Sequence, residues 1–105
     1  MTEKNPAGLQ ASTLSALIHV FTQYRQVDRV VLFGSRARGD YHSRSDIDLS
    51  IESATEIPPE VFFAVDEAAG IYKVDIVNRN HLNNHRLAKK IEQEGIVIYK
   101  RDEEQ

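Results

Sequence analysis

One polar stretch organises this chain: Gly34-Ser35-Arg36-Ala37-Arg38-Gly39-Asp40-Tyr41-His42-Ser43-Arg44-Ser45-Asp46-Ile47-Asp48-Leu49. It places a glycine–serine pair, several arginines and two alternating aspartates between two apolar runs. Backbone N–H groups and arginines bind phosphate, and carboxylates bind divalent cations. We therefore expect this stretch to carry the functional site and its surroundings to form the scaffold.

The two apolar runs predict strands on either side of this stretch. Residues 29–33 are continuous in β-branched and aromatic residues, which indicates a central strand covered on both faces. Residues 46–52 alternate, so their apolar side chains share one face while Asp46 and Asp48 share the other. Residues 35–45 have no period and predict a loop with one helical turn near its start.

The remaining segments predict helices and two further strands. The first is an amphipathic helix over 14–24, capped by Ser12 or Thr13 or beginning near Pro6. A second helix is opened by Pro58-Pro59, with Phe62 on its buried side and Gly70 as its cap, and a strand over 71–77 follows it. The last elements are a helix capped by Asn80 that runs through Glu94 and is ended by Gly95, and a strand over 96–99. The predicted fold class is therefore α/β (α+β), a small mixed sheet of about four strands with helices packed against it. We expect one domain over residues 1–105, with an ordered core of about 9–99 and a polar tail over 100–105.

Composition narrows the class of protein. The net charge is −3, which argues against an extended nucleic-acid-binding face. The chain has no cysteine, so disulfides, thiolate metal sites and thiol catalysis are excluded. Its first residues lack the apolar core of a signal peptide, and no apolar run approaches the roughly 20 residues that span a bilayer. We expect a cytoplasmic protein with no membrane segment.

Three aspartates are the candidate metal ligands and catalytic groups. Asp46 and Asp48 leave the same face of one predicted strand, about 6.6 Å apart, and Asp75 lies within a later strand that can lie beside it. At about 5 Å and an effective dielectric constant near 20, each pair of carboxylates repels by about 3 kcal/mol. A cation offsets this repulsion, and Mg²⁺ suits oxygen ligands combined with substrate phosphates. Two such ions can clamp the attacking and leaving oxygens of a phosphoryl-type transfer.

The glycine–serine pair and the arginines are the candidate phosphate ligands. Gly34 and Ser35 at a strand end let backbone N–H groups approach a phosphate closely. Arg36, Arg38 and Arg44 can neutralise the oxygens of a triphosphate. Taken alone, the glycine–serine pair is better explained by an ordinary turn, and each arginine by a place on the surface, so the spacing to the aspartates carries the argument.

The spacing from Gly34-Ser35 to Asp46-Ile47-Asp48 resembles the signature of the DNA polymerase beta-like nucleotidyltransferase superfamily, especially its minimal nucleotidyltransferases. The resemblance implies that Gly34 and Ser35 bind the phosphates of a nucleoside triphosphate, and that Asp46 and Asp48 hold metal with Asp75 as the third acid. It implies ATP as substrate, Mg²⁺ as cofactor with two ions bound, and in-line attack on the α-phosphate.

The resemblance also implies a partner. Minimal nucleotidyltransferases are often paired with a helical HEPN-domain protein, typically encoded by a neighbouring gene. AMP transfer to a tyrosine of that partner silences its RNase activity, so the pair is a toxin–antitoxin system with this chain as the antitoxin.

Two alternatives stay open at this point. The chain could be a non-catalytic binding module that neutralises a HEPN RNase by covering it. It could also transfer a nucleotide to a small molecule, as larger aminoglycoside-modifying relatives do, although no second domain is evident for such an acceptor. A metal site at His81 and His85, four residues apart, is less favoured because no third ligand of evident spacing accompanies them.

Overall fold

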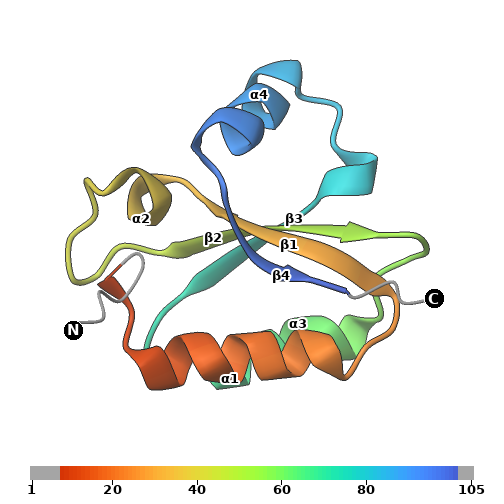
Figure 1. Ribbon diagram of the computed structural model, residues 1–105, viewed down its shortest axis with the longest axis horizontal. Coiled ribbons are helices and arrows are strands. Elements are labelled where there is room, and N and C mark those ends of the chain that lie inside the picture. Colours follow the sequence, from red (N-terminus) through yellow and green to blue (C-terminus); the bar gives the residue numbers. More distant parts are fainter. Residues whose placement is uncertain (1–7, 102–105) are drawn as a thin grey trace.

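Four strands form one mixed sheet in the order β3-β2-β1-β4 in the computed structural model, which describes residues 8–101 (Figure 1). The strands are β1 (Val27–Phe33), β2 (Ile47–Ser53), β3 (Val74–Asn78) and β4 (Ile96–Lys100). The helices are α1 (Ala11–Thr22), α2 (Ser35–Arg38), α3 (Pro59–Ala69), the short 3-10 helix η2 (Arg79–His81) and α4 (His85–Glu94). The pairings β1–β2 and β1–β4 are antiparallel, and β2–β3 is parallel. The expected mixed sheet of four strands with packed helices is confirmed.

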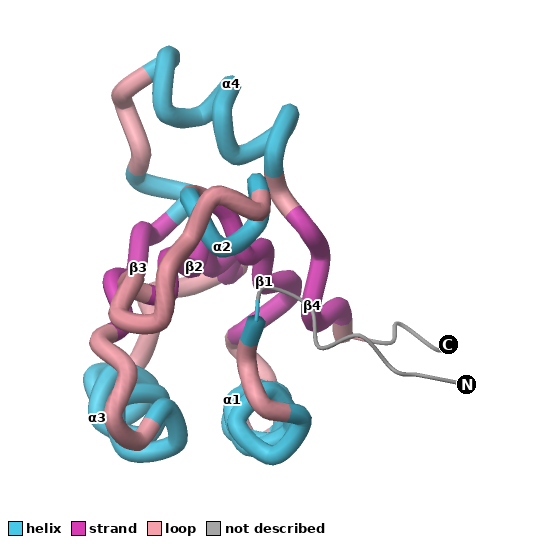
Figure 2. The backbone as a smooth tube through the Cα atoms, turned by 90° about the vertical axis from the view of Figure 1, so that its left-hand side faces the viewer, coloured by secondary structure: helices cyan, strands magenta, loops and turns pink. Residues whose placement is uncertain are grey.

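Helices cover both faces of the sheet. Figure 2 shows α1 and α3 side by side below the sheet and α4 above it. The central strand β1 serves both layers: Val30 and Leu32 belong to the larger core with α1 and α3, and Val31 and Phe33 to the smaller core under α4. This explains why its sequence is apolar at successive positions rather than at alternate ones.

The larger core holds the α1 and α3 layer to the sheet. Its fully buried members include Leu17 and Phe21 from α1, and truncating a buried phenylalanine of this kind to alanine typically costs about 3–5 kcal/mol. The apolar stripe predicted for the first helix is therefore confirmed in its centre. The predicted cap is wrong, because the helix already begins at Ala11 after Gln10, whose side chain makes no capping hydrogen bond. A start near Pro6 lies outside the described residues.

Helix α3 begins and ends as its sequence predicts. Pro59 lies in its first turn and Gly70 follows its last residue with a φ of 66°. The prediction for Phe62 is wrong: its side chain is 41% exposed, and that of Phe63 is 75% exposed. The buried side of α3 is the single row Val61, Val65 and Ala69, and one residue along a helix turns a side chain by about 100° away from such a row.

Helix α4 begins four residues later than predicted, because its cap is Asn84 rather than Asn80. The Asn78 side chain accepts a hydrogen bond from the Asn80 N–H and so caps the beginning of η2. The backbone is extended at Leu82, directly after η2. Asn84 is the residue that caps α4, since its side chain accepts a hydrogen bond of 3.1 Å from the Leu87 N–H. His81 and His85 consequently lie on different elements, so their four-residue spacing does not place them on one helical face.

The last described residues are anchored to the start of β1. The Arg101 N–H donates to the Asp28 carbonyl oxygen at 2.8 Å, and the Arg101 guanidinium contacts Asp28 Oδ1 at 2.5 Å and the Arg25 carbonyl oxygen at 3.1 Å. Lys100 is the last residue of β4. Lys100 and Arg101 therefore do not belong to a free polar tail of the kind expected over 100–105, and residues 102–105 lie outside the described range.

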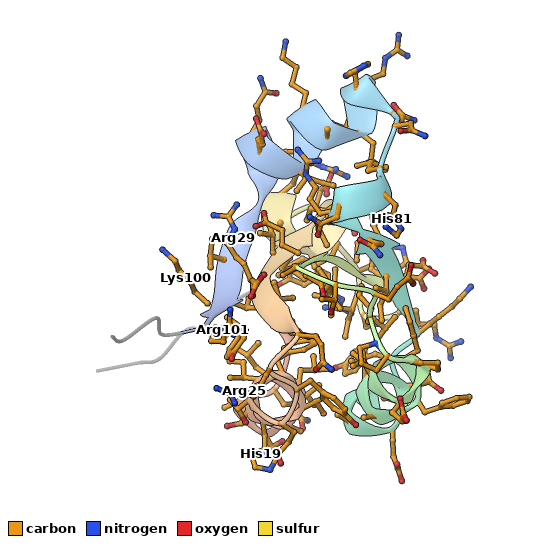
Figure 3. The ribbon with its side chains drawn as sticks, turned by 90° about the vertical axis from the view of Figure 1, so that its right-hand side faces the viewer. His19, Arg25, Arg29, His81, Lys100 and Arg101 are labelled. Atoms are coloured by element: carbon orange, nitrogen blue, oxygen red, sulfur yellow. The ribbon has the colours of Figure 1, made fainter. Side chains whose placement is uncertain are left out.

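A row of basic side chains marks this end of the sheet. Figure 3 shows Arg25, Arg29, Lys100 and Arg101 along one side of the molecule. Two of them are paired with carboxylates, Arg101 with Asp28 and Arg29 with Glu52 at 3.2 Å. Among the helices of residues 8–101, none has the length and apolarity needed to cross a membrane.

Candidate active site

The predicted aspartates come together at one end of the sheet. Because β1 runs antiparallel to β2 and β2 runs parallel to β3, the end of β1 meets the beginnings of β2 and β3. Asp48 is paired across the sheet with Phe33 on β1 and with Asp75 on β3. Asp46 lies just before β2 on the same strand path. The sheet thus places Asp75 beside Asp48, the adjacency that the sequence only suggested.

Asp48 is the electrostatic centre of this group. Its partial burial raises the pKa of its carboxyl group above the ordinary value, and the negative charges of Asp75 and Asp46 raise it further. Arg38 acts in the opposite direction and lowers the pKa. Burial, with the two negative neighbours added to it, therefore outweighs Arg38 at Asp48, and a bound cation would favour the ionised carboxylate.

Gly34 makes room for the Asp48 carboxylate. Its φ of 81° lies in the region that L side chains rarely adopt, and a Cβ built on Gly34 would overlap Asp48 Oδ2. The chain then turns at once into α2, where the N–H groups of Ala37 and Arg38 both donate to the Gly34 carbonyl oxygen at 3.0 Å. Gly34 therefore lies directly beside Asp48, and Ser35 follows it as the first residue of α2.

Arg36 has a different place from the one expected of a phosphate ligand. Its side chain is buried, and its guanidinium donates to the backbone carbonyls of Ser45 at 3.1 Å, Ser43 at 3.3 Å and His42 at 3.4 Å. Its terminal carbon also lies 5.1 Å from the Tyr41 ring centroid and 5.0 Å from that of Tyr72. In this structure Arg36 therefore holds the loop in front of β2, and its expected contact with a phosphate stays a prediction.

Arg38 is exposed and lies at the mouth of the site. It forms ion pairs with Asp40 at 3.3 Å and with Glu94 of α4 at 3.2 Å. The hydrogen bond to Asp40 and then that to Glu94 raise the pKa of the Arg38 guanidinium. Of the predicted arginines, Arg38 is thus the one that acts on Asp48 electrostatically. Its guanidinium already forms ion pairs with Asp40 and Glu94.

A cavity lies between the loop before β2 and the segment before β3, and two of its lining residues, Arg44 and Lys73, each stand two positions before an aspartate, Asp46 and Asp75. Its volume is about 390 Å³, and its lining residues are Ser43, Arg44, Ile71, Tyr72 and Lys73. Of these, only Arg44 is a candidate from the sequence. The sequence predicts Ile71 inside a strand, but the strand begins at Val74 and the Ile71 side chain is 94% exposed. The sequence offers one indication that Lys73 lies near the site, which is its position two residues before Asp75.

The residues present suit a hard divalent cation that a substrate helps to bind. Among residues 8–101, no three acidic or histidine side chains stand close enough to chelate one ion by themselves. Asp46, Asp48 and Asp75 nevertheless interact electrostatically, and Gly34 leaves the space that the Asp48 carboxylate occupies. Mg²⁺ is usually bound by one or two carboxylates together with substrate phosphates, so this donor set fits it.

The sequence of this chain is similar to those of known proteins. The family model described as Polymerase beta, Nucleotidyltransferase matches residues 15–104. MJ1379 of Methanocaldococcus jannaschii, assigned as a protein adenylyltransferase, is 27% identical over 99 residues, which cover 82% of this chain and 98% of that protein.

Solved structures show the same fold. A toxin–antitoxin complex with AMP-PNP matches with a TM-score of 0.69 and 20% identity, over 84% of this chain and 73% of the other. The tri-AMPylated Shewanella oneidensis HEPN toxin in complex with MNT antitoxin matches with a TM-score of 0.65 and 16% identity, over 89% and 74% of the two chains. At these identities the likeness establishes the arrangement of helices and strands.

Proposed function

The chain belongs to the polymerase beta nucleotidyltransferase family and has its fold, and we propose that it transfers AMP from ATP to a tyrosine hydroxyl of a HEPN-type protein partner. The observation that carries this proposal is the position of Asp48, which lies between the Gly34 turn on one side and Asp75 on the other. This arrangement supports the proposal, because it would align groups for phosphate, cation and acceptor across three strands.

The acceptor class is taken from the relatives. MJ1379 is assigned as a protein adenylyltransferase, and one structural relative is an AMPylated HEPN toxin bound to its MNT antitoxin. We propose that this chain acts as the antitoxin of such a pair, in the cytoplasm, with a HEPN RNase as its acceptor. A partner encoded by a neighbouring gene would fit this role.

Each group has a defined task in the proposed reaction. Backbone N–H groups at Gly34 and Ser35 bind phosphate oxygens, and Arg38 adds a positive charge once it leaves its acidic neighbours. Asp46 and Asp48 would hold Mg²⁺, which supplies charge neutralisation on the phosphates when bound. Asp75 orients the acceptor hydroxyl and takes its proton.

The proposed transfer conserves atoms and electrons. The tyrosine oxygen forms a bond to the α-phosphorus of ATP, and the bond from that phosphorus to the bridging oxygen of the β-phosphate breaks. Pyrophosphate leaves with that electron pair, and the proton of the hydroxyl passes to Asp75. Positioning and electrostatic stabilisation provide most of the rate in such reactions.

A non-catalytic binding module is the second candidate. Phe62 and Phe63 on α3 expose apolar surface of the kind that protein partners cover. Binding alone, however, gives no reason to keep mutually repelling carboxylates around Asp48. Transfer to a small molecule is less favoured, because the acceptor would need an enclosing pocket and the cavity in front of β2 and β3 is partly open to solvent.

The test is AMP transfer with purified components. The chain is co-purified with its helical partner and incubated with Mg²⁺ and ATP labelled at the α-phosphate, and the partner is analysed by autoradiography and intact mass. Wild type should label the partner, and Asp46→Ala/Asp48→Ala should not. Equal labelling by the double variant would refute the metal assignment, and a stable complex without labelling by wild type would favour the binding module.

A further inference from the structure

We propose that the cavity lined by Ser43, Arg44, Ile71, Tyr72 and Lys73 receives an acidic segment of the protein substrate next to its acceptor hydroxyl. We call it the acceptor cavity. This inference rests on the proposed transfer of AMP to a protein. It adds the place where that protein binds and the charge of the segment that is bound.

The position of the acceptor cavity is the first argument. Asp48 is paired with Phe33 on one side, directly before the Gly34 turn, and with Asp75 on the other side. In-line displacement needs the attacking and leaving oxygens on opposite sides of the phosphorus. If the phosphates lie on the Gly34 side, the acceptor arrives from the β3 side, and the acceptor cavity opens there.

The walls of the cavity are continuous with the segments that carry the aspartates. Ser43 and Arg44 belong to the loop that leads to Asp46, and Lys73 lies two residues before Asp75. The two walls are joined by the hydrogen bond of 2.8 Å from the Ile47 N–H to the Lys73 carbonyl oxygen. A segment held between them is therefore delivered beside the catalytic carboxylates.

Charge is the second argument. Within residues 8–101, Arg44 and Lys73 have no carboxylate within ion-pair distance, whereas Arg38 and Arg101 are both engaged by acidic side chains. Two exposed cations without such partners flank this cavity in a chain whose net charge is −3. They complement a segment with acidic side chains, and they would repel a basic one.

Shape is the third argument. The Tyr72 ring has two supports on this wall: the Arg36 guanidinium lies 5.0 Å from its centroid, and the ring packs against the larger core. Ile71 presents an almost fully exposed aliphatic side chain beside it. A volume of about 390 Å³ accommodates a few side chains but not a folded element. The occupant is accordingly a short extended segment with an apolar or aromatic residue among acidic ones.

The experiment uses a panel of peptides of equal length that each contain one tyrosine, flanked by glutamates, by serines or by lysines. AMP transfer is measured with Mg²⁺ and labelled ATP. Wild type should label the acidic peptide about tenfold faster than the basic one. Arg44→Glu/Lys73→Glu should lose or invert that order while its KM for ATP stays within about twofold. Arg44→Ala/Lys73→Ala, which introduces no new charge, should show a smaller loss of the same preference.

The matched control is Arg25→Glu/Lys100→Glu, which changes the net charge equally at the opposite end of β1 (Figure 3). It should keep the wild-type order of peptides. The inference is overturned if Arg44→Glu/Lys73→Glu keeps that order too, or if wild type labels its protein partner but no peptide. It is also overturned if the variant instead raises KM for ATP, which would make the cavity a nucleotide subsite.

Failure of the proposed function is distinguishable from these outcomes. It would appear as labelling of neither partner nor peptides by wild type, or as equal labelling by wild type and Asp48→Ala. Circular dichroism of every variant shows whether the fold is retained, and all four substituted cations are exposed.

Discussion

Gly34 and Asp48 are complementary in shape: the hydrogen that Gly34 carries in place of a side chain is what allows the Asp48 carboxylate to lie against the turn. The two residues come from different strands, since Gly34 follows β1 and Asp48 is the second residue of β2. Their fit therefore links the turn that would hold phosphate to the carboxylate that would hold metal. It also makes this part of the site sensitive to a single methyl group.

Gly34→Ala should reduce AMP transfer about a hundredfold, because the new Cβ displaces Asp48 and misplacement by about 1 Å has effects of that size. It should also cost about 1–2 kcal/mol in the free energy of unfolding through backbone strain. Transfer rate and urea denaturation are the measurements. Gly39→Ala is the control, because Gly39 has a φ of 100° but no atom lies within 4 Å of the place that a Cβ would take there. A comparable loss of rate in Gly39→Ala would show that strain alone is responsible.

Asp48→Asn should stabilise the protein at neutral pH in the absence of metal while abolishing transfer. The pKa of Asp48 is raised in the folded state by burial and by Asp75 and Asp46, so its ionised form destabilises the fold. Below about pH 4 the carboxyl group is protonated in both folded and unfolded states, and the variant gains nothing. The gain in Tm should grow as pH rises from there through the raised pKa. A pH-independent difference in Tm would contradict this assignment.

Arg36→Ala should lower the free energy of unfolding by about 2–4 kcal/mol, because it removes the donor to three loop carbonyls and the cation between two tyrosine rings. Arg36→Lys should recover little, since an ammonium group cannot reproduce the planar fork. Urea denaturation is the measurement. Arg38→Ala should leave stability nearly unchanged and act on KM for ATP instead. If Arg36→Ala, like Arg38→Ala, changed the KM for ATP and left the free energy of unfolding unchanged, Arg36 would be a substrate ligand.

Glu94→Gln should lower KM for ATP about two- to fivefold, because it removes one of the two carboxylates that hold Arg38 away from substrate. Steady-state kinetics with the peptide acceptor provide the measurement. Glu92→Gln is the matched control on the same helix, since it breaks the exposed pair with Arg79 at 3.4 Å. An unchanged KM in Glu94→Gln would indicate that Arg38 does not bind the phosphates.

The parts of the fold that follow from local chemistry are predictable from sequence. The β-branched run before Gly34 indicates a strand covered on both faces, and Pro59 and Gly70 mark the two ends of α3. The alternation from Asp46 onward places two carboxylates on one face. Even the adjacency of Asp75 to Asp48 can be suggested, because a helix between two strands favours their parallel pairing.

Features that depend on competing local partners are not predictable in this way. Asn78, Asn80 and Asn84 can each cap a helix, and the choice among them depends on how the chain leaves β3, which the sequence does not reveal. Arg36 and Arg38 are chemically identical and two residues apart, yet α2 buries one and exposes the other. Phenylalanine is a residue type that favours the core, but the buried row of α3 consists of Val61, Val65 and Ala69, and Phe62 lies outside that row.

The strand order has a consequence for how this chain is made. β1 leaves the ribosome first among the strands, but its second neighbour, β4, leaves last. Until then one edge of the most apolar strand is open, which is the condition that favours aggregation and chaperone binding. Chains cut before Ile96 should accordingly accumulate in the insoluble fraction, and the anchoring of Arg101 to Asp28 closes that edge when synthesis reaches it.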